Sequence, residues 1–211
     1  MLERRQSVRE EIANSLTHGI FLLAAVICSP ILIAKSLQTQ DNLNIVATSI
    51  FAASVILVYF ISTLYHAMPR NKTKDILRLI DYGAIFLLIA GSYTPIALNV
   101  IKGGWGWALF SIEWTLAVVG IIFLFYSGLK HKGILLLFYV IMGWLLIIAI
   151  KPLWLSMPVW GLFWVFMGGV AYTLGISYYR ISHLNFRHFI WHIFVVAGTT
   201  CHCIAVFLYA T

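Results

Sequence analysis

Charged residues are scarce in this chain of 211 residues, and acidic residues most of all. Asp and Glu together number seven and Lys and Arg fourteen, so that 10% of the sequence is charged while 62% is apolar. A soluble globular domain carries about 25% charged residues. The composition therefore excludes an ordinary soluble domain and indicates a protein of the membrane throughout.

Cysteine is also rare: the sequence has three, Cys28, Cys201 and Cys203. No C-x-x-C pair is present, so neither a disulfide framework nor a cysteine zinc site is predicted. All three lie in or beside apolar segments, where a thiol fills small apolar space.

What the chain has in quantity is apolar runs of about twenty residues, the length of a helix that crosses a hydrocarbon core of ~30 Å. The runs are continuous and do not alternate with period two, which favours helices over a barrel. We therefore expect an all-α integral membrane protein, with residues 1–211 forming one domain of seven transmembrane helices. The spans are predicted at about 15–37, 43–66, 76–100, 106–127, 133–151, 157–178 and 187–209.

The first run follows Arg4, Arg5 and Arg9, as a secretory signal would, but it extends to Leu37 without a small-residue cleavage site. We interpret it as a retained first span. Residues 7–14 are predicted to form a short helix on the cytoplasmic face.

Lys and Arg are distributed unequally between the two sides of the predicted bundle. The N-terminal segment and the second, fourth and sixth loops carry eleven of the fourteen, and the other side carries Lys35, Lys102 and Lys151. The positive-inside rule then places the N-terminus in the cytoplasm and the C-terminus outside a cell (inner) membrane. This orientation is the reverse of a G-protein-coupled receptor, and it explains the basic balance without nucleic acid. The oligomeric state is not predicted.

Ionisable residues inside a span are costly and usually face a cavity or a partner. Those of this chain are His18, His66, Asp81, Glu113, His188, His192 and His202. In the predicted orientation, His66 ends the second span, Asp81 lies about one turn into the third, and the His188–His192 pair begins the seventh. Three helices therefore bring three imidazoles and a carboxylate to a similar depth on the cytoplasmic side.

Residues four apart share a helix face, so His188 and His192 can bind one ion. Three imidazoles and one open position form a catalytic zinc geometry, in which Asp81 would accept a proton from bound water and Ser62 would add a hydrogen bond. The alternatives are that the histidines lie at the interface as polar-tipped aromatic side chains, and that Asp81 only forms a salt bridge with Arg78.

Three spaced motifs resemble the signatures of the progestin and adipoQ receptor family. They are Glu11, Asn14, Thr17 and His18 before the first span; Ser62-x-x-x-His66 followed by Asp81; and His188-x-x-x-His192 in the last span. The runs STLYHA (62–67), LIAGSYTP (88–95) and IWH (190–192) look like its bacterial branch, the hemolysin III proteins. The likeness covers essentially the whole chain.

The resemblance implies an intramembrane zinc held by His66, His188 and His192, with Asp81 and Ser62 around the bound water. It also implies hydrolysis of a lipid amide or ester, because the family is grouped with alkaline ceramidases. His18 and Glu11 are expected either to support the metal ligands or to anchor the first span.

The remaining intramembrane groups are predicted to be structural. His202 should form an interhelical hydrogen bond, and Glu113 should have a local partner such as Thr115. Pro95 is expected to kink the third span.

Four functions stay open at this point. A zinc hydrolase acting on a membrane lipid is the first, and a non-enzymatic regulator or sensor with a structural zinc is the alternative. A cytolysin and a transporter are less favoured. The chain is too apolar for a secreted toxin, and no second line of ionisable residues leads to the outside.

Overall fold

The apolar segments of the sequence fold into helices, and no strand occurs in the part of the chain that the computed structural model describes, residues 6–181 and 184–211. The elements in chain order are α1 (Val8–Leu37), α2 (Asn42–Ala67), α3 (Lys72–Pro95), the π-helix η1 (Ile96–Ile101), α4 (Gly103–Ser127), the 3-10 turn η2 (Gly128–His131), α5 (Lys132–Trp144), the 3-10 turn η3 (Leu145–Ala149), α6 (Ile150–Ser156), α7 (Val159–Tyr179) and α8 (Arg187–Tyr209). The all-helical prediction is confirmed. Arg4 and Arg5, which enter the charge count, lie outside the described residues.

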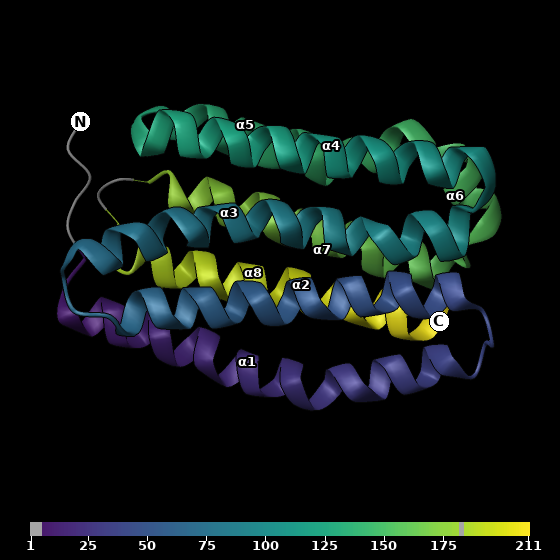
Figure 1. Cartoon of the computed structure of the whole chain (residues 1–211), viewed down its shortest axis with the longest axis horizontal. Helices are drawn as coiled ribbons and strands as arrows, with labels where there is room; N and C mark the ends of the chain where they lie inside the picture. The colour runs from purple at the N-terminus through teal and green to yellow at the C-terminus, as the bar shows by residue number, and fades with distance from the viewer. Residues whose placement is uncertain (1–5, 182–183) are drawn as a thin grey trace.

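The long helices lie side by side in a bundle, with the start of α1 and the end of α8 at opposite ends (Figure 1). Neighbours in sequence pack together from α1 to α4, and α7 packs on α8. Helix α8 also contacts α1, so that the two ends of the chain close the bundle. Helices α1, α3 and α8 therefore all begin at the same end (Figure 1).

Six helical stretches among the described residues are long and apolar enough to cross a membrane. One of these stretches covers residues 103–156 and is 54 residues long. It reverses at η2, where Gly128 has a φ of +59°, a conformation that glycine adopts without steric cost. Helices α4 and α5 consequently pack against each other on either side of this turn (Figure 1).

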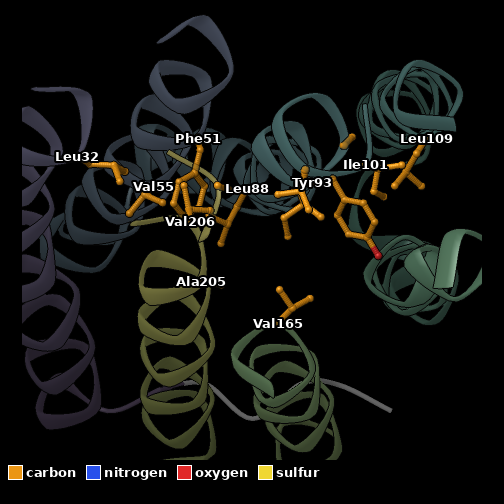
Figure 2. Close-up of a cluster of buried hydrophobic side chains, with 14 of the residues drawn as sticks. Leu32, Phe51, Val55, Leu88, Tyr93, Ile101, Leu109, Val165, Ala205 and Val206 are labelled. Atoms are coloured by element: carbon orange, nitrogen blue, oxygen red, sulfur yellow. The ribbon is translucent and has the colours of Figure 1, made fainter. Parts of the chain in front are cut away.

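The main apolar core lies around α3, which is the most buried of the long helices. Figure 2 shows Phe51 and Val55 of α2 facing Leu88 of α3 and Val206 of α8. Large apolar side chains on the outer surface stay exposed, for example Leu155 at 76%. A buried core with an apolar perimeter is the arrangement of a protein that lipid surrounds.

Two predicted details are wrong. Residues 7–14 form no separate helix, because α1 runs without a break from Val8 to Leu37. The segment left between the spans predicted at 133–151 and 157–178 is no loop but helical, because α6 continues to Ser156. Pro152 is tolerated there since it lies in the first turn of α6, where backbone N–H groups have no intrahelical partner.

Close packing of α7 on α8 depends on small residues, as membrane helices often require. A Cβ atom on Gly168 would lie 2.3 Å from the His202 ring, and one on Gly175 would lie 2.8 Å from Trp191 and Phe194. Pro95 marks the point where the third span changes from α-helix to the π-helix η1, and the kink expected there stays a prediction.

Candidate metal centre

The start of α1 is fixed by a capping box, and this sets the direction of its polar side chains. Ser7 Oγ accepts a hydrogen bond from Glu10 N at 3.3 Å, and Glu10 Oε2 accepts one from Ser7 N at 2.8 Å. From this start, Glu11, Asn14 and His18 follow one another at helical spacing. Asn14 and His18 are buried and Glu11 is partly buried, so α1 presents three polar groups to the interior of a bundle.

The three histidines that the spacing singled out lie together. His66 at the end of α2 and the pair on the first turns of α8 offer ring nitrogens that all lie within 4.8 Å of one another. His66 Nε2 and His188 Nε2 are 3.1 Å apart. His66 and His192 are 3% and 1% exposed. The cluster can hold a metal ion.

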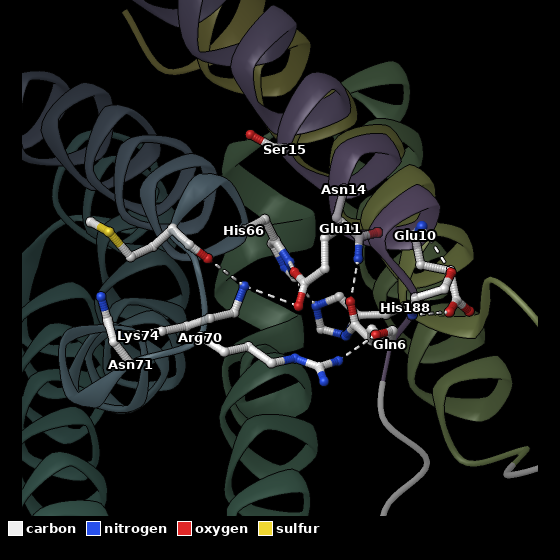
Figure 3. Close-up of polar contacts among 12 residues, drawn as sticks. Gln6, Glu10, Glu11, Asn14, Ser15, His66, Arg70, Asn71, Lys74 and His188 are labelled. Carbon is white, nitrogen blue, oxygen red and sulfur yellow. Dashed lines mark hydrogen bonds and ion pairs between the residues drawn. The ribbon is translucent and has the colours of Figure 1, made fainter.

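Glu11 lies directly behind this cluster (Figure 3). His66 Nδ1 is 2.7 Å from Glu11 Oε2, so the carboxylate accepts the Nδ1–H and leaves Nε2 facing the other histidines. Lys74 Nζ is 3.0 Å from Glu11 Oε1 and also donates to the carbonyl of Met68. A carboxylate that orients a histidine in this way is typical of metal sites.

His18 comes close to the cluster in a different way. Its ring stacks on His192 with centroids 3.6 Å apart, and neither of its nitrogens has a hydrogen-bond partner among the described residues. Tyr59 packs edge-on against its other side. Stacking holds the His192 ring in place but provides no partner for its nitrogen.

Ser62 and Asp81 lie on the inner side of the cluster. Together with His18 and His192 they line a cavity of about 70 Å³ within the bundle. The Ser62 hydroxyl is near the Asp81 carboxylate, yet it has no hydrogen-bond partner within the described part of the chain. His192 Nδ1 is likewise buried without a partner there. Buried polar atoms of this kind require an explanation, and a bound water or ion is one of those that native proteins use.

Other sequence predictions fare differently. The charge of Arg78 acts on Asp81, so the alternative that Asp81 pairs with Arg78 stays a prediction. His202 Nε2 donates across α8 and α7 to the carbonyl of Val165 at 3.3 Å, as expected. Glu113 is fully buried, and neither Thr115 nor any other described residue bonds its oxygens, so the predicted local partner is absent.

Sequence reasoning missed two contributors to this region. By sequence Lys74 belongs to a basic segment between the second and third spans, whereas the structure places it in α3, where it is 8% exposed and pairs with Glu11. Glu10 accepts a hydrogen bond from the backbone N–H of Phe186 at 2.9 Å and so ties the start of α8 to α1. The Ser7-x-x-Glu10 pattern was visible as a capping-box signature, but nothing local indicates the contact with Phe186.

Comparison with known proteins agrees with these motifs. The family model described as Haemolysin-III related matches residues 6–203. "Hemolysin-3 homolog" of Bacillus subtilis is 40% identical over 96% of this chain and 95% of its own length, and "Hemolysin-3" of Bacillus cereus is 38% identical over 99% and 95%. The human "Monocyte to macrophage differentiation factor" is 25% identical over 95% of this chain and 84% of its own.

The matches extend over nearly the full length and include the helices that carry all three histidines. They agree with the spaced motifs and with the apolar helical bundle, and the distant human match joins the bacterial proteins to a wider group. The chain is thus a multi-pass membrane protein that belongs to the haemolysin-III-related family, the bacterial branch of the progestin and adipoQ receptor family.

Proposed function

We propose that this protein is a zinc-dependent hydrolase that cleaves an amide or ester bond of a membrane lipid near the cytoplasmic face. The observation that carries the proposal is that the three-histidine cluster borders a cavity through His192, and that Ser62 and Asp81 line the same cavity. A structural metal site needs no such cavity, whereas a catalytic site must leave room for water and substrate.

The donor set suits zinc. Ligand nitrogens of a tetrahedral zinc lie roughly 3.3 Å apart, and the Nε2 atoms of His66 and His188 are separated by 3.1 Å. Three imidazoles leave a fourth position, and Glu11 already occupies the far side of His66. When bound, zinc would polarise a carbonyl oxygen and lower the pKa of its water toward ~7.

The protein groups around the site have separate roles in this proposal. Asp81 accepts a proton at its carboxylate as general base. The Ser62 hydroxyl lies near that carboxylate and is placed to orient it by donating a hydrogen bond. Glu11 holds the His66 ring through Nδ1, and His18 holds the His192 ring by stacking.

A lipid would reach the site from the side of the bundle. A second cavity of about 460 Å³ shares Tyr93, Trp144 and His202 with the inner cavity and extends between α5 and α7 to Ile147 and Phe166. Ile147 and Phe166 are exposed on the outer surface of the bundle. This apolar route connects the lipid-facing surface with the cavity beside Asp81.

The proposal includes seven crossings, with the N-terminus in the cytoplasm and the C-terminus outside. A straight helix of 54 residues would be about 81 Å long, so the reversal at η2 supports two crossings in residues 103–156. The eleven-to-three distribution of Lys and Arg supports the orientation. A C-terminal alkaline phosphatase fusion should be active and a C-terminal GFP fusion dark; the opposite result would reverse the orientation.

Metal content and hydrolysis, measured on the same purified protein, test the function. We expect near one zinc per chain, lost in folded His188→Ala and His66→Ala. Asp81→Asn should keep its zinc and lose release of fatty acid from a panel of lipid amides and esters. Asp41→Asn is the matched control, because this N-cap of α2 is remote from the cluster and Asn caps equally well.

The same experiment addresses the alternative of a regulator with a structural zinc. The alternative is supported by the contacts that join three helices at the cluster. The histidines connect α2 with α8, and Glu11 connects α1 with His66 of α2. The alternative predicts that His188→Ala destabilises the bundle while Asp81→Asn leaves the biological effect intact. If wild type hydrolyses lipid and Asp81→Asn does so equally well, Asp81 is not the general base. If folded wild type takes up no zinc, the proposal of a zinc-dependent enzyme is refuted.

A further inference from the structure

A polar pocket of about 660 Å³ opens on the cytoplasmic side of the histidine cluster. We call it the vestibule. His188 and Glu11 form part of its wall, so the vestibule and the inner cavity lie on opposite sides of the same cluster. Figure 3 shows Arg70, Lys74 and His188 grouped around Glu11 in this region.

The vestibule is lined by an excess of cationic groups. The basic residues on its wall are Arg70, Lys72, Lys74, Arg78 and Arg187. The acidic ones are Glu10, Glu11 and Asp75. Five cations and three carboxylates leave a net charge of about +2. Two of the carboxylates are engaged within the wall, Glu11 with His66 and Lys74, and Glu10 with backbone N–H groups.

Helix ends add to the positive potential. Helices α1, α3 and α8 begin at this face, and each N-terminus carries the positive end of a helix dipole. Asn71 caps α3 through Lys74 N, while Phe186 N at the start of α8 already binds a carboxylate oxygen of Glu10. Anionic oxygens are thus favoured at this end of the bundle.

We propose that the vestibule binds a phosphate group, either on the headgroup of an anionic phospholipid or free in solution. Three of its cations are arginines, whose planar forks match phosphate oxygens. Its volume falls in the range of about 300–1,000 Å³ that is usual for small-ligand pockets. Binding as such is independent of hydrolysis. If the proposed function also holds, on which this extension rests, the substrate is an anionic phospholipid with its headgroup beside His188.

Basic residues collect on the cytoplasmic side of any membrane protein, so the test compares cations within the vestibule with cations outside it. The vestibule variant is Arg70→Gln/Lys72→Gln, which removes two exposed cations, one from the loop before α3 and one from the first turn of α3. The matched control is Lys130→Gln/Arg180→Gln, which removes two cations from the predicted cytoplasmic side but not from the vestibule wall. Both variants should keep the wild-type zinc content and melting temperature.

The full chain in detergent is titrated with phosphatidic acid and with phosphatidylcholine of the same acyl chains, and bound lipid is counted by native mass spectrometry. Wild type should prefer phosphatidic acid. The vestibule variant should lose about 25-fold in affinity for it, at roughly fivefold for each cation removed. The control variant should stay within about twofold. A second arm follows the melting temperature in inorganic phosphate without lipid.

A phosphate-induced stabilisation that the vestibule variant loses, without preference for phosphatidic acid, would support the site and assign it to a soluble phosphate. Equal binding of the two lipids together with no effect of phosphate would overturn the proposal. Equal losses in both double variants would also overturn it, since the attraction would then come from general surface charge. These outcomes are separate from the zinc and hydrolysis tests, which can fail while phosphate binding is retained.

Discussion

Replacing Glu11 tests how the histidine cluster is held. Its carboxylate accepts the Nδ1–H of His66 at 2.7 Å and pairs with Lys74 at 3.0 Å, and its side chain is only 16% exposed. Removing the partner of a metal-bound histidine lowers metal affinity by about 10- to 100-fold. That range corresponds to roughly 1.4–2.8 kcal/mol of binding free energy.

The structure orders the variants within this range. Glu11→Gln keeps a carbonyl oxygen that can accept from His66 Nδ1 but loses the charge opposite Lys74, so we expect about a 10-fold loss of zinc affinity. Glu11→Ala loses the acceptor as well and leaves the Lys74 ammonium buried beside the histidines, so the loss should approach 100-fold. Zinc affinity is measured by competition with a chromogenic chelator in detergent.

Glu10→Gln is the matched control, since this neighbouring carboxylate caps α1 and contacts Phe186 N, whereas the contact with His66 is made by Glu11. It should bind zinc within about twofold of wild type. Wild-type zinc affinity in a folded Glu11→Ala variant would refute the reasoning, because His66 would then need no carboxylate to orient it.

Three further predictions concern stability. Gly120→Ala should destabilise the fold by about 1–3 kcal/mol, because its Cβ would lie 2.2 Å from the buried Phe86 ring, whereas Gly133→Ala meets nothing within 4 Å and should be neutral; equal melting temperatures would contradict this packing. Glu113→Met should raise the free energy of unfolding by about 1–3 kcal/mol, since both carboxylate oxygens are buried without a partner among the described residues; a lower melting temperature would reveal a partner. Chelating the zinc should lower the melting temperature of wild type, because free zinc at 1,000 times its Kd stabilises the folded state by about 4.1 kcal/mol. The chelator should not change the melting temperature of His66→Ala; a change in that variant would place the metal elsewhere.

The sequence predicts the histidine cluster well because the relevant geometry is local. His188 and His192 share a face through their spacing of four, and charge counting brings the ends of the second and last spans to one side. No comparable rule predicts the ion pair between Lys74 and Glu11, because that contact depends on how the start of α3 is placed against α1 in the folded chain. The same holds for η1 and η3, where tertiary packing changes the type of helix within one apolar run.

The position of the histidine cluster within the fold explains how buried ionisable side chains are stable in a membrane protein. Ionisable groups in a bilayer are stable only where partners or water reach them, and here His188 borders the polar vestibule while His192 borders the inner cavity. Glu11 and Lys74 complete the vestibule side with charges that compensate each other. On the cavity side, both nitrogens of His18 are buried without described partners, which a purely structural arrangement would have satisfied or replaced by an apolar side chain. The cost of those unpaired atoms therefore favours a site that binds something on its inner side, as the hydrolase proposal requires.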